Sequence, residues 1–146
     1  MFHPETPPGA RAHLAHRTPR PWQSAAMAID PTGADMKAFL GAAPDEPVTM
    51  LNLLRFVEGG RARYDEYIAH FRRTSERFGA QVVYYGYGGA PVVAEQGQDW
   101  DAVLLVHYPS RRAFSDMVRD PEYQQGTHLR TEALVEAVLQ PTTPAP

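Results

Sequence analysis

The sequence contains no cysteine among its 146 residues. This absence excludes disulfide bonds, thiolate catalysis and metal centres that cysteine ligates. No apolar run approaches the roughly 20 residues that a membrane-spanning helix requires, and no continuous apolar stretch resembles a secretory signal. We therefore expect a cytoplasmic protein without a membrane partner, in which any nucleophile is oxygen or nitrogen.

Basic residues are sparse as well, and all but one of the 14 are arginine, the exception being Lys37. The chain has a formal net charge of −3 at pH 7. Three of the arginines fall within residues 1–26 beside a single acid, Glu5, so the remaining sequence is more acidic than the whole. Because binding to a phosphate backbone depends on clustered basic side chains, we expect no nucleic-acid partner.

Residues 1–26 differ in composition from the rest of the chain. They include five prolines and the histidines His3, His13 and His16, with almost no apolar periodicity. Such a segment buries too little apolar surface to offset the entropy of ordering, and we predict a disordered N-terminal extension. The hydrophobic content of 43% suits one core, in a chain too short for two comfortable domains. We therefore expect one domain over residues 27–141 and a tail over 142–146.

From residue 27 onward the sequence alternates between helix-like and strand-like patterns. Asp30 and Pro31 have the character of an N-cap followed by the first turn of a helix. The expected elements, in chain order, are this short helix, a strand over 48–56, an amphipathic helix from 60 to 78, a strand over 81–87, a turn over 86–91, a strand over 100–108, a helix capped by Ser110, further helical turns within 120–134 and a strand over 135–139.

The order β-α-β-β-α-β, preceded by one extra helix, predicts an α+β fold of the ferredoxin-like type with an antiparallel sheet. Two helices on one side of such a sheet leave its other face uncovered. Residues 100–108 alternate without making either face purely polar. An apolar uncovered face needs a partner, so we predict a homodimer in which two sheets stack as a dimeric α/β barrel.

Several spaced motifs resemble those of a known family. They are Val48-Thr49-Met50-Leu51-Asn52-Leu53-Leu54-Arg55-Phe56, Tyr64-x-x-Tyr67, Trp100-Asp101, Tyr108-Pro109-Ser110-Arg111 and Asp120-Pro121-Glu122-Tyr123. In this order they resemble the bacterial domain-of-unknown-function family 1330 over most of residues 27–141. The resemblance implies the dimeric α/β-barrel superfamily, which includes polyketide cyclases, cofactor-free oxygenases and lactone isomerases. It does not imply one reaction, because fold-level analogy does not fix function.

Asn52 and Arg55 interrupt the most apolar stretch of the chain. A buried polar side chain must find a partner, so each is a candidate site residue. We hypothesise that Asn52 holds a carbonyl or enolate oxygen and that Arg55 binds a carboxylate or phenolate of the substrate. The structural alternatives are that Arg55 pairs with an acid, such as Asp101 or Glu58, and that Asn52 satisfies backbone groups at a bulge. Period-two geometry places Asn52 and Arg55 on opposite faces, so without a bulge at most one lines a pocket.

His107 is the only histidine on a predicted strand, and an unperturbed imidazole titrates near neutral pH. We therefore predict His107 as a general base, with Tyr85 on a neighbouring strand orienting its ring. The structural alternative is a histidine satisfied in the core or at the end of its strand. His107, Asn52 and Tyr85 together form the predicted catalytic set.

Four further residues are predicted to bind substrate. Trp100 and Tyr108 belong to an aromatic cluster around the middle strands, which suits stacking on a planar molecule. Tyr123 and Arg130 lie in the C-terminal helical region, where they are expected to close over the pocket mouth. The alternative for the first pair is packing in the core or dimer seam, and for the second pair packing at the surface.

The sequence lacks the residue patterns of metal and haem sites. Asp99-x-Asp101 has no third carboxylate nearby in sequence, the histidines lack metal-ligand spacing, and haem has no convincing histidine ligand. We therefore expect neither a metal nor a cofactor. The sequence favours a small cofactor-independent enzyme of the isomerase, cyclase or oxygenase type, acting on an aromatic or carbonyl-containing small molecule. The alternative is a dimeric module, without catalysis, for small-ligand binding or stress response.

Overall fold

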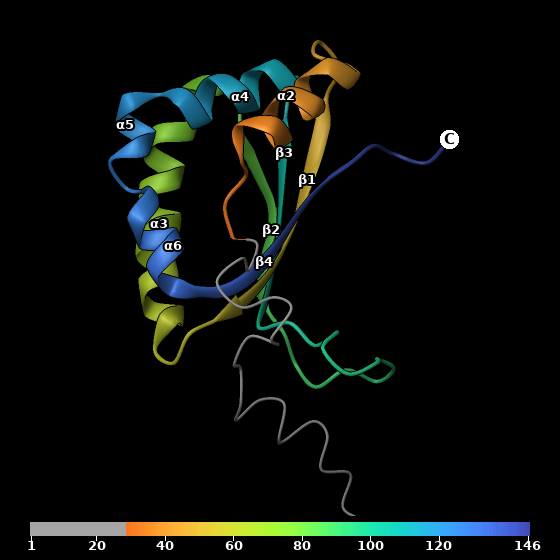
Figure 1. The fold of residues 1–146 in the computed structure, drawn as a ribbon, viewed down its shortest axis with the longest axis vertical. Coiled ribbons are helices and arrows are strands. Elements are labelled where there is room, and N and C mark those ends of the chain that lie inside the picture. The colour runs from red at the N-terminus through yellow and green to blue at the C-terminus, as the bar shows by residue number, and fades with distance from the viewer. Residues whose placement is uncertain (1–28) are drawn as a thin grey trace, which may run out of the picture.

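The structure is a computed structural model of the chain, and it describes residues 29–146 (Figure 1). The extension predicted over residues 1–26, with its three histidines, lies outside the described residues. From residue 29 onward a helix precedes the order β-α-β-β-α-β, and short extra helices come before the last strand. No helix in this part of the chain is long and apolar enough to cross a membrane.

Four antiparallel strands form one sheet in the order β2-β3-β1-β4. They are β1 (Val48–Phe56), β2 (Gln81–Tyr87), β3 (Ala102–Tyr108) and β4 (Leu134–Thr142). The bounds of β1 and β2 are those predicted, whereas β3 starts later and β4 extends further at both ends. As an edge strand β4 can accommodate Pro141, which lacks a ladder donor. This is the ferredoxin-like α+β fold predicted from the sequence.

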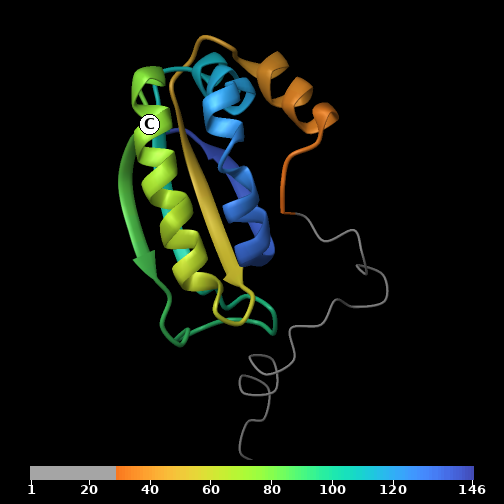
Figure 2. The same ribbon diagram turned by 90° about the vertical axis from the view of Figure 1, so that its left-hand side faces the viewer.

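Helices cover one face of this sheet, as Figure 1 shows nearly edge-on and Figure 2 from the helix side. They are α2 (Gly33–Ala42), α3 (Gly60–Ser75), α4 (Arg111–Arg119), α5 (Pro121–Gln124) and α6 (Thr127–Ala133), with the 3-10 turn η2 (Glu76–Phe78) after α3. Ser110 caps α4, as predicted, by accepting the backbone N–H of Ala113 at 3.0 Å. Asp120 caps α5 by accepting the backbone N–H of Tyr123 at 3.0 Å.

The start of α2 differs from the prediction. Thr32, and not Asp30, is the N-cap, because its hydroxyl accepts the N–H of Asp35 at 3.1 Å. The carboxylate of Asp35 in turn accepts the N–H of Thr32 at 2.8 Å and completes a capping box. Asp30 is thereby left to bond elsewhere, and its carboxylate lies 2.7 Å from Arg130.

Alternation along β1 and β3 divides the sheet into two faces. Residues directed toward the helices, such as Met50, Leu54 and Val106, are buried in the core. Apart from Arg55, the intervening residues of these two strands are only partly buried, because no helix covers that side (Figure 1). The apolar members of this uncovered face are Leu51, Leu53, Val103, Leu105 and Val138. The sequence prediction of an uncovered sheet face that is not purely polar is therefore confirmed.

Candidate active site

A cavity of about 310 Å³ lies between the sheet and the helices. This volume is at the lower end of the range for small-molecule sites. Its walls come from β1, β3, β4 and helices α3 to α6, together with Asp30 and Pro31 ahead of α2. Apolar side chains supply most of the lining, and the polar groups that matter for chemistry are Asp30, Asn52, Tyr67, Tyr123 and Arg130.

Arg130 is the buried cation of this cavity. It lies in the last turn of α6, and only 6% of the residue is exposed. Its Nη1 donates to Oδ1 of Asp30 at 2.7 Å and to the carbonyl of Ile29. Its Nη2 is buried and has no hydrogen-bond partner within residues 29–146. Since an unmatched buried donor costs about 1–3 kcal/mol, one side of the guanidinium is suited to an additional acceptor.

A tyrosine cluster lies beside Arg130. The hydroxyls of Tyr67 and Tyr123 are 2.8 Å apart and share a hydrogen bond, with the Tyr67 ring also packed on Tyr64 at a centroid distance of 5.2 Å. The hydroxyl of Tyr64 is buried next to the Arg130 guanidinium, whose proximity opposes the rise of the Tyr64 pKa, and neither this hydroxyl nor Nη2 of Arg130 makes a well-aligned hydrogen bond within the described chain. The backbone carbonyl of Tyr123 is fixed by Nε2 of His70 at 2.9 Å. The cluster is therefore held rigidly on α3 and α5.

Burial controls the protonation of these phenols. Removal from water raises the pKa of Tyr64, Tyr67 and Tyr123 above the usual value for tyrosine, because a phenolate is poorly solvated there. The nearby Arg130 cation opposes this effect at Tyr64 without reversing it. All three hydroxyls consequently remain neutral hydrogen-bond donors at physiological pH, which suits the stabilisation of negative charge on a ligand oxygen.

Asn52 lies in the middle of β1 and faces the same cavity. Its amide nitrogen donates to the carbonyl of Leu104 on β3 at 3.3 Å, and 7% of the residue is exposed. Arg55, three residues later, lies on the opposite face, as period-two geometry predicted. Tyr108 also lines the cavity, with its ring packed edge-on against Phe114 at 5.0 Å.

The structure thus brings together four of the eight predicted site residues, namely Asn52, Tyr108, Tyr123 and Arg130. The sequence analysis missed Asp30, which it interpreted as a helix cap, and Tyr67, which it named only within a motif of the family. The helical spacing of Tyr64 and Tyr67 carried the only available signal, because two phenols on one buried helix face need polar partners.

His107 and Tyr85 lie away from this cavity. His107 is on the uncovered face, where Nδ1 lies 3.1 Å from the hydroxyl of Thr49. The expectation that Tyr85 orients the imidazole is wrong, because the Tyr85 hydroxyl donates to Asp65 on α3 at 2.9 Å. Thr49 takes the orienting position instead. The catalytic role of His107 stays a prediction, and it does not enter the function proposed below.

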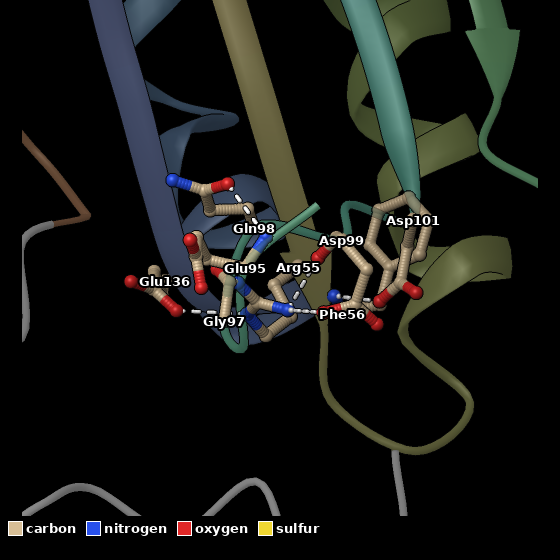
Figure 3. A network of polar contacts seen from close by, with 8 residues as sticks. All are labelled: Arg55, Phe56, Glu95, Gly97, Gln98, Asp99, Asp101 and Glu136. Atoms are coloured by element: carbon tan, nitrogen blue, oxygen red, sulfur yellow. Dashed lines mark hydrogen bonds and ion pairs between the residues drawn. The ribbon is translucent and has the colours of Figure 1, made fainter. Parts of the chain in front are cut away.

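Arg55 organises the loop between β2 and β3, where its side chain lies among Gly97, Asp99 and Glu136 (Figure 3). Arg55 donates from Nε to Glu136 at 2.7 Å and from Nη2 to the carbonyl of Gly97 at 2.9 Å, and Nη1 pairs with Asp99. Its guanidinium also stacks on Trp100, 4.4 Å from the ring centroid. The planar guanidinium carries five N–H donors, so it can bind several acceptors at the same time. Arg55 therefore holds residues 97–100 against the end of the sheet and lies outside the cavity lining.

Asp101 takes part in the same region. Its carboxylate accepts the backbone N–H of Phe56 at 2.8 Å, and its own N–H donates to the carbonyl of Leu54. Arg55 therefore pairs with acidic side chains, as the structural alternative in the sequence analysis expected. The partners are Asp99 and Glu136. Within residues 29–146, no group of three or more histidine, aspartate or glutamate side chains is arranged to hold a metal ion.

Residues 59–140 match the family described as Domain of unknown function (DUF1330). The chain belongs to this family. A protein of unknown function from Rhodopseudomonas palustris is similar in structure, with 30% identity, a TM-score of 0.74, and coverage of 82% of this chain and 98% of that one. The assignment agrees with the resemblance seen in the sequence motifs. No curated protein matches the chain.

More distant structures share only the fold with this member of the family. One is a hydroxynitrile lyase from Passiflora edulis, with 15% identity, a TM-score of 0.53, and coverage of 68% of this chain and 94% of that one. Another is a dimeric ferredoxin-like protein of unknown function from a Jannaschia species, with 12% identity, a TM-score of 0.51, and coverage of 66% and 98%. Neither likeness assigns a reaction to this chain.

Proposed function

We propose that this protein is a small cofactor-independent enzyme of the isomerase, cyclase or oxygenase type, acting on a carbonyl-containing metabolite in the cavity between sheet and helices. The observation that carries the proposal is Arg130, a buried cation with one unmatched nitrogen in a cavity that neutral tyrosines also line. Buried ionisable groups of this kind concentrate at functional sites, because a purely structural cation is usually fully paired.

The proposed chemistry removes a proton from the carbon beside the substrate carbonyl. Asp30 accepts this proton at the cavity wall, and the substrate becomes an enolate. Tyr67 and Tyr123 share a single hydrogen bond, so one of their two hydroxyl hydrogens stays free to donate to the carbonyl oxygen. This donor stabilises the charge that develops on the oxygen. Arg130 supplies an anchor for a substrate carboxylate, and Asn52 a further polar contact.

Three reactions follow from the same enolate. Where the substrate carries a double bond next to the deprotonated carbon, the enolate extends to a dienolate, and return of the proton from Asp30 to its far carbon shifts that double bond and completes an isomerisation. Attack of the enolate carbon on a second carbonyl within the substrate forms a carbon–carbon bond and completes a cyclisation, with the proton passing to the new alkoxide. Addition of dioxygen to the enolate carbon begins an oxygenation, in which the substrate is oxidised and dioxygen is reduced.

A second candidate is a binding module without catalysis, of the ligand-sequestering or stress-response type. The observation that favours it is the placement of His107, the predicted base, on the opposite side of the sheet from the cavity. Such a module retains ligand binding through Arg130 and the tyrosines but has no need of Asp30 as a proton acceptor. The two candidates therefore differ in whether a bound ligand exchanges its protons.

We also propose that the chain forms a homodimer through its uncovered face. The apolar residues of that face are only partly buried within one chain. The loop between β2 and β3 projects to the same side, away from the helices (Figure 1), and presents Val92 and Val93 with 100% and 91% of their surface exposed. Exposed apolar surface of this extent is typical of an interface between chains. The Arg55 contacts hold the base of this loop in place.

Proton exchange tests the enzymatic proposal without knowledge of the full reaction. The purified chain is incubated in heavy water with a panel of small oxo acids, and loss of the proton signal beside the carbonyl is followed by NMR. We expect acceleration by the natural chain and loss of the acceleration in Asp30→Asn, with Asp45→Asn as a matched surface control. Binding without accelerated exchange across the panel supports the binding module instead.

A further inference from the structure

A second cavity of about 510 Å³ adjoins the first beneath α2. The two share five wall residues, so they are neighbouring chambers of one site: Asp30, Pro31, Met50, Phe114 and Leu139. The chamber with Arg130 and the tyrosines is called the inner chamber here, and the one under α2 the outer chamber. A ligand that fills both passes the Asp30–Pro31 segment that lines each of them.

The outer chamber differs from the inner one in chemistry. Its walls include Met36 and Phe39 from α2 and Ala137 from β4. Its one cation, Arg111, already donates to the carbonyl of Phe39 at 3.1 Å and stacks on that ring at 4.6 Å. Asp35 is bonded within the α2 capping box. The polar groups around the outer chamber are thus already bonded to other parts of the chain, and the surface offered to a ligand is apolar.

A ligand in the outer chamber would bury apolar side chains of α2 that are now partly exposed to water. Helix α2 has no buried residue, and its inward side chains Met36 and Phe39 are only partly buried. Phe39 packs against the core, with its ring edge-on to Phe114 at 5.4 Å between centroids. An apolar group in the outer chamber removes both side chains from water, and this burial favours binding.

Resting on the function proposed above, we infer that the substrate is an amphipathic oxo acid whose polar head binds in the inner chamber and whose aliphatic or aryl-aliphatic tail occupies the outer chamber. The carboxylate accepts from Arg130, and the ketone oxygen accepts from the free hydroxyl hydrogen of the Tyr67–Tyr123 pair. The tail passes Pro31 and Leu139 and contacts Met36 and Phe39. A single buried cation matches a single carboxylate head.

Tail length provides the test. Pyruvate, 2-oxohexanoate, 2-oxooctanoate and 2-oxodecanoate are titrated into the full chain by calorimetry. We expect the dissociation constant to fall by about fourfold for each methylene that enters the outer chamber, the factor expected for burial of one such group. Equal affinity for all four acids contradicts an apolar tail site and leaves the oxo-acid head site standing.

Variants on α2 separate the two chambers. Met36→Glu places a charge in the outer chamber and removes only a partly buried contact with the core, because α2 carries no buried residue. We expect this variant to bind pyruvate as the natural chain does and to lose the gain from tail length. Ala34→Glu, on the same helix but outside the lining, is the matched control and retains that gain. If no oxo acid binds the natural chain at any length, the proposed function itself fails.

Discussion

The carboxylate of Asp30 lies 2.7 Å from Nη1 of Arg130, a residue 100 positions further along the chain. This pair ties the segment before α2 to α6 and forms one wall of the cavity. The hydroxyl of Thr131 reinforces the connection by donating to the other carboxylate oxygen at 2.9 Å. One acid therefore closes the site and supplies the proton acceptor of the proposed reaction.

Replacing Asp30 with asparagine is expected to lower the free energy of unfolding by about 1–2 kcal/mol. The loss arises because Arg130 is left with a weaker partner, and it is moderate because about half of the Asp30 side chain is exposed to solvent (48%). Urea denaturation monitored by circular dichroism measures it. Asp45→Asn removes an exposed pair with Arg112 and is expected to change the value by less than about 0.5 kcal/mol. Equal effects of the two changes contradict the assignment.

The Tyr67–Tyr123 hydrogen bond is accessible to a double-mutant cycle. Tyr67→Phe and Tyr123→Phe each leave the other hydroxyl buried without its partner, and each is expected to destabilise by about 1–2 kcal/mol. The double variant removes both hydroxyls, so it is expected to cost less than the sum of the two. Additive losses in urea denaturation indicate that the two hydroxyls do not interact.

Alkaline pH is expected to destabilise the fold through its buried tyrosines. Burial raises the pKa of Tyr64, Tyr67 and Tyr108 in the folded chain above the ordinary value of 10.0. Below pH 10 these groups are protonated in both states, so stability is unaffected. Above pH 10 the unfolded chain loses these protons first, and the free energy of unfolding falls as pH rises. Urea midpoints measured between pH 8 and 11 check the direction, and Tyr67→Phe reduces the slope. A flat profile contradicts the burial of these neutral tyrosines.

Much of this fold follows from local pattern. The strand at β1 was predicted to the residue, because a dense apolar run follows Pro47 and ends before the glycine pair at 59–60. Asn52 was recognised because a polar side chain in such a run needs a partner, and the structure places it on the cavity wall. Tyr123 and Arg130 were expected near a pocket mouth and line the cavity instead.

The positions of Asp30 and His107 relative to the cavity could not be predicted from the neighbouring sequence, because they depend on how distant segments pack together. Asp30 pairs with a residue 100 positions away, and nothing in its neighbourhood distinguishes that pair from a helix cap. His107 belongs to an alternating strand, and the sequence did not settle which of the two faces the helices cover. The burial of Leu104 and Val106 beneath the helices then fixes His107 on the other side.

The proposed dimer depends on the loop that Arg55 anchors. Replacing Val92 and Val93 together with aspartate is expected to shift the chain from dimer to monomer, because the charges oppose burial of the loop against a second chain. Sedimentation velocity measures the change. Ala62→Asp adds a charge at an exposed position of α3 and is expected to leave the dimer intact. A natural chain that sediments as a monomer contradicts the proposed assembly.

Calorimetric titration of 2-oxooctanoate into the natural chain, Arg130→Gln and Arg112→Gln tests the central claim most directly. Arg130 is the buried cation of the cavity and Arg112 an exposed one paired with Asp45, so each change removes one positive charge. We predict binding to the natural chain and Arg112→Gln, and affinity at least about tenfold weaker in Arg130→Gln, the loss expected for a charge-assisted hydrogen bond. Equal affinity for all three folded proteins contradicts the assignment of the cavity as the binding site.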